Sequence, residues 1–252
     1  MTEYATATPR RGPLGSRPGP WTVLVVASAV VLIAAALLLA ALWSTSDATS
    51  STSYTAQLPG TLVGVELEVA EGDVEIVGGG GSDVLVSRVD SSAFGHWPTE
   101  QRFITEGVFR IESTCPELVI GACAADYRIT VPEQVPLRVV VEHGDIRLTA
   151  NRESALLSTL DGSITVEAFC GPALDATAGG GDVDVDATCP TDRLALRTGS
   201  GDIRARMPPG QYNIDAQTLD GDVAIRGVTD DPASSARIQA FSNDGDVTVE
   251  VG

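Results

Sequence analysis

The stretch RTGSGDIRARMPPGQYNIDAQTLDGDVAIRG, residues 197–227, contains the same short pattern twice. In each copy a Gly-Asp step precedes alternating apolar and polar residues, and the steps at Gly201 and Gly221 lie 20 residues apart. Glycine reaches positive φ at low steric cost, and aspartate can hydrogen-bond to neighbouring backbone, so the step indicates a sharp bend between two extended segments. A repeated bend predicts a repeated structural unit.

The same step recurs along most of the chain. With serine once in place of aspartate, it begins at Gly72, Gly144, Gly162, Gly181, Gly201, Gly221 and Gly245. The last six steps are separated by 18 to 24 residues. A period near 20 residues is typical of a solenoid, in which each repeat is too small to bury its own apolar face and therefore stacks on its neighbours.

Apolar residues occupy the second and fourth positions after each step, and polar or small residues stand between them. Ile164 and Val166 follow one step, and Val183 and Val185 follow the next. Alternation with a period of two is typical of a strand with one buried face. A similar alternation precedes each step, so each repeat predicts strand, turn, strand, turn.

These patterns predict an all-β fold, namely a single-stranded β-solenoid or β-helix-like domain of about 20-residue repeats. Successive units should lie directly over one another, with Ile164, Val183, Ile203 and Val223 in one column. A β-sandwich is the alternative, and it would scatter the Gly-Asp turns instead of stacking them. Between residues 88 and 130 the periodicity blurs, and residues 91–103 and 113–126 are predicted to be longer loops.

A 23-residue stretch near the N-terminus, Trp21 to Trp43, contains no charged residue. It is long enough to cross a hydrocarbon core of about 30 Å at roughly 1.5 Å per residue. Three arginines precede it, whereas the next basic residue after it is Arg88. The positive-inside rule therefore predicts one transmembrane α-helix with a cytoplasmic N-terminus. The alternative, a cleaved signal peptide, fits less well because its apolar core is usually about 7–15 residues long.

The chain is thus predicted to divide into four parts. Residues 1–20 are a disordered cytoplasmic tail, and residues 21–43 are the transmembrane helix. Residues 44–57 are rich in Ser and Thr and cannot bury enough apolar area to order themselves, so they are predicted to be a flexible linker. Residues 58–252 form the extracytoplasmic solenoid domain, which places the protein at the cell membrane.

The charge of the chain is strongly acidic, with 16 basic and 34 acidic residues and a formal net charge of −18. Only three of the basic residues and one of the acidic residues precede residue 44, so 13 basic and 33 acidic residues leave about −20 on the remainder. Such a surface repels phosphate groups, which argues against nucleic acid as a partner.

Four cysteines follow the predicted membrane segment, where disulfides can form. Cys170 and Cys189 each lie eight residues after the glycine of a repeated step, so they occupy the same place in consecutive repeats. Coils stacked about 4.7–4.9 Å apart bring two such Cα atoms within the roughly 4.4–6.8 Å that a disulfide spans. We predict a Cys170–Cys189 disulfide and a Cys115–Cys123 disulfide that closes a local loop; the alternative is four free thiols. Seven residues between Cys115 and Cys123 do not fit the usual spacing of a zinc site.

The segment RITVPEQVPLRVVVEHGDIRL, residues 128–148, followed by serial Gly-Asp units, resembles the bacterial putative-adhesin family of unknown function. The resemblance covers about residues 58–252. It implies a β-rich domain that often follows one transmembrane segment, and it carries no set of functional residues to transfer.

The aspartates of the repeated bends are the sharpest chemical candidates. They comprise Asp73, Asp145, Asp182, Asp202, Asp222 and Asp246, reinforced by Asp161, Asp220 and Asp244. Stacked carboxylates about 5 Å apart repel one another, and Ca²⁺ could bridge them. The spacing differs, however, from the nine-residue repeats of Ca²⁺-binding β-helices. We therefore favour solvent-facing, turn-forming aspartates, and we expect no metal and no cofactor.

A second candidate is a set of outward arginines beside acidic neighbours: Arg147, Arg204, Arg206 and Arg226. They could line the groove of a polysaccharide-binding or polysaccharide-cleaving β-helix protein, although a solvated face with weak ion pairs is the commoner meaning. The sequence contains no G-x-S-x-G motif and no histidine placed near a nucleophile. We expect an adhesion, sensing or scaffolding module without catalysis, with a protein or glycan partner at the cell envelope.

The last residues, DGDVTVEVG (244–252), leave no further sequence to cover the outer edge of the final strand. An uncovered edge invites pairing with another chain. The sequence therefore predicts that Val247 and Val249 lie at a free edge, where the C-terminal coil could dock onto another subunit.

Overall fold

The computed structural model describes residues 20–44, 48–56, 61–79, 81–93, 96–116 and 122–252. The chain forms two compact units, Met1–Thr45 and Ser46–Gly252. The predicted tail at residues 1–19 lies outside the described residues.

The first unit contains one described element, the helix α1 (Pro20–Ser44), which coincides with the predicted transmembrane segment. Among the described residues, no helix is both long and apolar enough to cross a membrane. The transmembrane prediction is therefore not confirmed.

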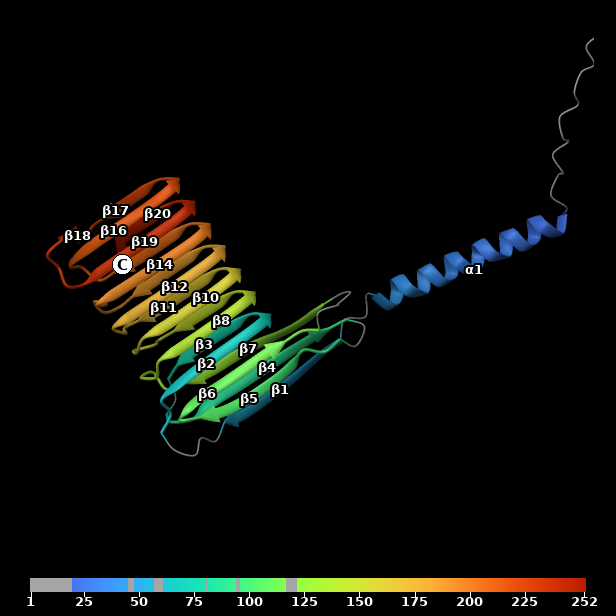
Figure 1. The fold of residues 1–252 in the computed structure, drawn as a ribbon, viewed down its shortest axis with the longest axis horizontal. Coiled ribbons are helices and arrows are strands. Elements are labelled where there is room, and N and C mark those ends of the chain that lie inside the picture. Colours follow the sequence, from blue (N-terminus) through green and yellow to red (C-terminus); the bar gives the residue numbers. More distant parts are fainter. Residues whose placement is uncertain (1–19, 45–47, 57–60, 80, 94–95, 117–121) are drawn as a thin grey trace, which may run out of the picture. The chain divides into compact units, whose positions relative to one another are not determined.

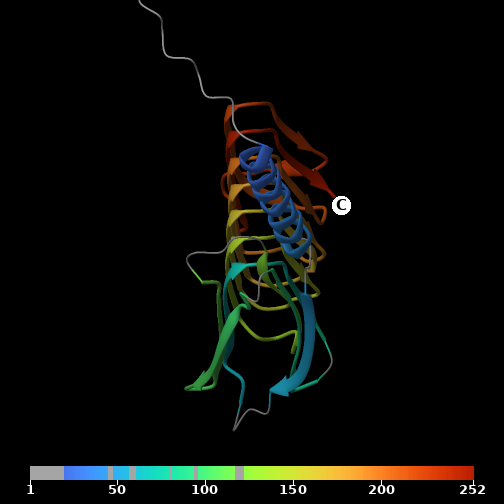
Figure 2. The same ribbon diagram turned by 90° about the vertical axis from the view of Figure 1, so that its right-hand side faces the viewer.

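The second unit consists of two ten-stranded sheets, and Figure 1 shows their strands as a series of rungs. Sheet A contains, in spatial order, β1 (Ala48–Ala56), β4 (Val84–Ser92), β7 (Cys123–Val131), β3 (Val74–Gly78), β9 (Ile146–Thr149), β11 (Ile164–Phe169), β13 (Val183–Ala187), β15 (Ile203–Met207), β20 (Val247–Val251) and β17 (Val223–Arg226). Sheet B contains β18 (Thr229–Asp230), β16 (Gln211–Asp220), β19 (Arg237–Asp244), β14 (Arg193–Ser200), β12 (Ala173–Gly180), β10 (Ala155–Asp161), β8 (Leu137–His143), β2 (Gly64–Glu71), β6 (Val108–Thr114) and β5 (Thr99–Thr105). Figure 2 shows the two sheets as facing walls.

Each coil of the solenoid is a strand of sheet B, a Gly-Asp or Gly-Ser bend, and a strand of sheet A. Neighbouring coils pair in parallel and in register, so that Ile164 faces Val183 and Val183 faces Ile203. The predicted stacking of like residues is therefore confirmed. We call the bend between the two strands of a coil its corner.

The coils do not follow one another in simple chain order. The C-terminal coil, β19 and β20, lies between the coil of β14 and β15 and the coil of β16 and β17. Val247 consequently pairs with Ile203 on one side and with Val223 on the other. Val223 belongs to the predicted column, but one place further along it than sequence order indicates. The prediction that the C-terminal strand forms the free edge is wrong, because β17 lies outside it.

The opposite end of the unit departs from the regular pattern. There β1 pairs antiparallel with β4, β4 pairs antiparallel with β7, and β5 pairs antiparallel with β6. Residues 48–56, predicted as part of a flexible linker, are thus strand β1, whose polar side chains are compatible with a strand because β4 satisfies its backbone hydrogen bonds. The predicted loops at 91–103 and 113–126 likewise contain parts of β4, β5, β6 and β7.

The core lies between the two sheets and is built from the inward residues of both. Ile164, Val183, Leu194 and Leu174 are all buried, as the alternation in the sequence predicts. Burial of each such side chain contributes about 1.5–3 kcal/mol relative to exposure. Because every coil exposes its apolar columns unless another coil covers them, stacking is the source of the stability.

Both predicted disulfides are present. Cys170 and Cys189 join neighbouring coils with 4.8 Å between their Cα atoms, and Cys115 and Cys123 close a loop with 6.0 Å between theirs. The first confirms that two repeats are aligned residue by residue.

Candidate functional site

The corners form one continuous hydrogen-bonded ladder along the stack. At each corner a side-chain oxygen accepts a hydrogen bond from the backbone N–H of the residue after glycine in the adjoining coil. The N–H groups of Asp145, Ser163, Asp202, Asp246 and Asp222 are bound in this way by Asp73, Asp145, Asp182, Asp202 and Asp246, at distances of 2.7 to 2.9 Å. Ser163 supplies its hydroxyl oxygen to the Asp182 N–H at 3.2 Å, and Asp126 extends the ladder to Asp73 at 3.0 Å.

Glycine is required at the corner by the close approach of successive coils. At Gly181, φ is +125°, and a Cβ atom would lie 2.3 Å from the carbonyl oxygen of Gly162. Hydroxyl groups also bind the corners, as Thr198 does by donating to the Gly181 carbonyl at 2.8 Å. The recurrence of Gly-Asp thus has two causes: glycine permits the contact, and aspartate ties the next coil to it.

This ladder bears directly on the Ca²⁺ hypothesis. One carboxylate oxygen of each of Asp73, Asp145, Asp182, Asp202 and Asp246 is engaged by a backbone amide. Asp161, Asp220 and Asp244 end strands of sheet B on the other side of the corner. Within the described part of the chain, no three His, Cys, Asp or Glu side chains gather in a way that could hold a metal ion.

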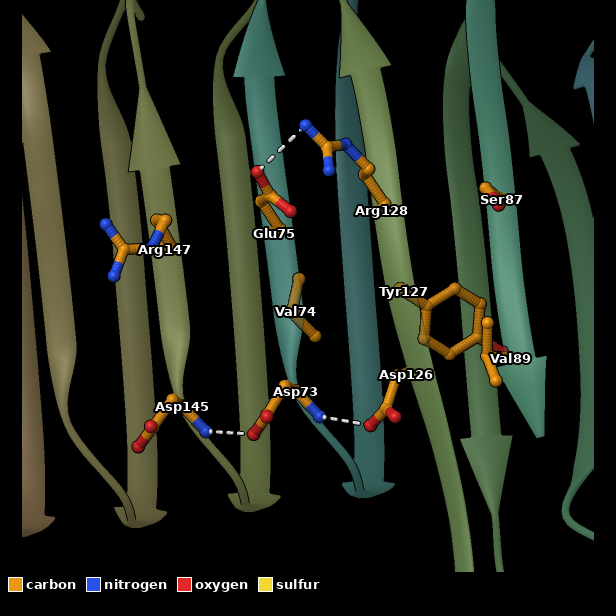
Figure 3. Close-up of a pocket in the computed structure, with 10 residues that line it drawn as sticks. All are labelled: Asp73, Val74, Glu75, Ser87, Val89, Asp126, Tyr127, Arg128, Asp145 and Arg147. Carbon is orange, nitrogen blue, oxygen red and sulfur yellow. Dashed lines mark hydrogen bonds and ion pairs between the residues drawn. The ribbon is translucent and has the colours of Figure 1, made fainter. Parts of the chain in front are cut away.

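A groove of about 450 Å³ lies where the parallel stack meets the antiparallel strands, and Figure 3 shows its walls. Its lining residues come from the corners, from β3, β9 and β7, and from β4: Asp73, Val74, Glu75, Ser87, Val89, Asp126, Tyr127, Arg128, Asp145 and Arg147. Three ladder aspartates therefore line one side of a surface depression that also holds two arginines.

Ion pairs set the direction of the two arginines. Arg128 Nη2 lies 3.3 Å from Glu75 Oε1 inside the groove, and Arg147 Nη1 lies 2.8 Å from Glu167 Oε1 on the next coil. The four side chains remain substantially exposed, so these pairs contribute little to stability. The groove consequently offers both donors and acceptors to a polar ligand.

The other three predicted arginines do not reach this groove. Arg204 and Arg206 are on β15 and Arg226 is on β17, several coils away. Arg206 instead pairs with Asp184 at 3.1 Å, within the same face. The structure thus brings Arg147 together with Asp73 and Asp145 but does not gather the whole predicted set.

A buried polar cluster links the two sheets at the antiparallel end, and the sequence analysis missed it. Arg88 Nη1 on β4 lies 3.1 Å from Glu100 Oε2 on β5, and the hydroxyls of Tyr54 and Tyr127 donate to the same carboxylate at 3.3 and 2.8 Å. Burial, followed by the charge of Glu100, raises the pKa of Tyr54 to about 12. Burial also raises the pKa of Tyr127 above its ordinary value.

The cluster was missed because it joins segments that the sequence presents as loops. The only available signal was the alternation of apolar residues at 84–89 and 108–113, which has the period of a strand. That alternation does not reveal that Arg88 and Glu100 face each other across the core.

A flattened, mainly parallel β-solenoid whose corners carry a Gly-Asp ladder defines the class of this protein as an extended repeat protein. The chain belongs to the Toastrack DUF4097 family, whose family model matches residues 60–252. This confirms the resemblance to a bacterial adhesin-type family of unknown function.

Solved structures with a similar arrangement include a putative cell adhesion protein from Clostridium sporogenes and a putative adhesin from Bacteroides fragilis. The first is 14% identical, with 81% of this chain and 100% of that chain covered and a TM-score of 0.49. The second is 10% identical, with 81% and 97% covered and a TM-score of 0.48. A likeness of this degree carries no functional conclusion. No curated protein matches the sequence.

Proposed function

We propose that this protein is a membrane-anchored adhesion or scaffolding module of the cell envelope that binds a polar partner without catalysis. The observation that carries the proposal is the groove where the parallel stack meets the antiparallel strands. It places Asp73, Asp126 and Asp145 beside Arg128 and Arg147 on an exposed face.

The surroundings of the groove favour binding over chemistry. Its aspartates are held in place by the corner ladder, and its arginines are already paired with glutamates, so the polar groups are preorganised on stacked strands. Preorganised donors and acceptors reduce the entropy lost on binding. An envelope glycan or a polar protein segment has the hydrogen-bonding groups to use both charges.

A binding assay with a matched control tests this proposal. The full chain is measured for retention on isolated cell-envelope material, as wild type, Arg147→Ala and Arg204→Ala. These arginines occupy one outward column, linked through Thr165 and Asp184, but only Arg147 lines the groove. We expect Arg147→Ala to weaken retention by about five- to tenfold, as for loss of one charged hydrogen bond, and Arg204→Ala to leave it unchanged. Equal retention of all three proteins contradicts the groove as the binding site.

The anchoring part of the proposal concerns the segment Trp21–Trp43. Its 23 residues lack charge, and Arg10, Arg11 and Arg17 precede it, which favours a single-pass, N-in orientation with the β-domain outside the cell. In intact cells, an added protease should digest the β-domain while a tag fused to the N-terminus stays protected. Recovery of the chain in the soluble fraction after cell lysis would refute anchoring.

The second candidate is a polysaccharide-binding or polysaccharide-cleaving protein. It draws support from the presence of an arginine and several carboxylates in one groove. Release of reducing ends from a panel of envelope polysaccharides, abolished by Asp145→Asn, would favour it over the non-catalytic module.

A further inference from the structure

We propose that a second copy of this chain pairs with the outer edge of β17, forming a two-fold symmetric dimer through the terminal coil. The inference goes beyond the proposed adhesion role, because it requires no envelope ligand. It starts from the finding that β16 and β17, and not the C-terminal strand, end the stack.

The terminal coil leaves the inner columns uncovered. Val247 and Val249 on β20 are 0% exposed, whereas their counterparts Val223 and Ile225 on β17 are 45% and 43% exposed. No strand of the described chain pairs with the other side of β17. The strand thus combines an unpaired backbone edge with apolar side chains that the rest of the column buries completely.

The corner bonding fixes which peptide groups of β17 face outward. The Val247 N–H donates to the Asp222 carbonyl at 2.9 Å, so Asp222 directs its carbonyl toward β20. Peptide groups of successive residues in a strand point to opposite sides, and Ala224 therefore also faces β20. Val223 and Ile225 direct their N–H and C=O groups to the unpaired edge.

This phase selects one antiparallel register between two copies. If Val223 of one copy exchanges both backbone hydrogen bonds with Ile225 of the second copy, symmetry requires the reverse pair as well, and the two-fold axis passes beside Ala224. The arrangement forms four backbone hydrogen bonds. It also brings the half-exposed valines and isoleucines of the two columns together.

The same register is complementary in charge, which is the reason to choose a second copy as the occupant. Asp222 of one copy falls directly opposite Arg226 of the other, and the symmetric pair repeats the match. Both residues are exposed and lie on the outward face with Ala224. Opposite charges at directly facing positions stabilise an antiparallel pair. The short strand β18 covers only Gln211–Tyr212 of the neighbouring strand, away from this contact.

A cysteine placed at the two-fold axis tests the register. Residues that face each other without backbone bonds have Cα atoms about 4.5 Å apart, a separation that a disulfide can span. All four native cysteines are already in disulfides, so Ala224→Cys adds the sole free thiol. The full chain in detergent, oxidised mildly, should form a covalent dimer on non-reducing gels. Thr165→Cys, an outward residue of an interior strand, is the matched control and should remain monomeric.

Charge exchange provides a second measurement that does not depend on oxidation. We expect Asp222→Arg and Arg226→Asp each to weaken self-association about tenfold or more at 0.15 M salt, and an equimolar mixture of the two variants to associate as a heterodimer. Absence of a covalent Ala224→Cys dimer above the Thr165→Cys control, or failure of the mixed variants to associate, overturns the proposal. Retention on envelope material is a separate assay, so the failure of the dimer and the failure of the proposed function can be told apart.

Discussion

Replacement of the corner glycine Gly181 by alanine tests the physical basis of the stack. Its φ of +125° is a conformation that side chains with a Cβ rarely adopt, which costs about 1–3 kcal/mol. The new Cβ would also lie 2.3 Å from the Gly162 carbonyl oxygen, so the coils must shift at a further cost of about 1–3 kcal/mol. The expected loss is roughly 2–6 kcal/mol, a large part of a typical folding free energy of about 5–15 kcal/mol.

The preceding residue provides the control. A Cβ at Gly180 would have its nearest neighbours at 3.6 and 3.7 Å, which are ordinary contacts, and its φ is not positive. Gly180→Ala should therefore change the free energy of unfolding by less than about 1 kcal/mol, with a slight gain possible from reduced freedom of the unfolded chain.

Urea unfolding of the full chain, followed by far-ultraviolet circular dichroism, measures both variants. The two substitutions add the same methyl group to adjacent residues, so composition and helix content cannot account for a difference between them. Equal unfolding midpoints for Gly181→Ala and Gly180→Ala would refute the reasoning that close coil contact dictates the repeated glycine.

Three further predictions follow from the fold. Val249→Ala should destabilise the domain by about 2 kcal/mol, and Ile225→Ala by clearly less, because only Val249 is covered on both sides; urea unfolding that ranks them the other way would contradict the order of the last two coils. Removal of the 170–189 disulfide by double Cys→Ala substitution should cost about 3 kcal/mol for a 19-residue loop, measured by the same unfolding curves, and an unchanged midpoint would refute it. Because burial raises the pKa of Tyr54 to about 12, the folded state keeps its proton while the unfolded state loses it near pH 10; stability should fall as pH rises from about 10 to 12, and Tyr54→Phe should reduce that fall.

The regular half of the domain was predictable from the sequence because its information is local and repeated. A Gly-Asp bend every 20 residues, with apolar residues at fixed offsets, identifies both the strands and the faces they bury. The same offsets gave the Cys170–Cys189 pairing, since equal positions in stacked repeats are neighbours.

The candidate groove was only partly predictable. Asp73, Asp145 and Arg147 were singled out by the repeat, but Asp126, Arg128 and Glu75 were not, because the strand that carries Asp126 and Arg128 lies next to β3 across a gap of about 50 residues in the chain. Strand β1 was missed for a related reason. Its Ser- and Thr-rich sequence buries little, and it is ordered by backbone pairing with β4.

By itself, the sequence determined the repeat, the bend chemistry, the inward columns and the inter-coil disulfide, because each depends on residues within one unit or at the same place in the next. Only the tertiary structure decided which coil ends the stack. All coils present nearly the same corner and the same apolar columns, so the periodic pattern fits several neighbours equally well. The insertion of β19 and β20 before β16 and β17 therefore depends on the path of the connecting segment, which periodicity does not encode.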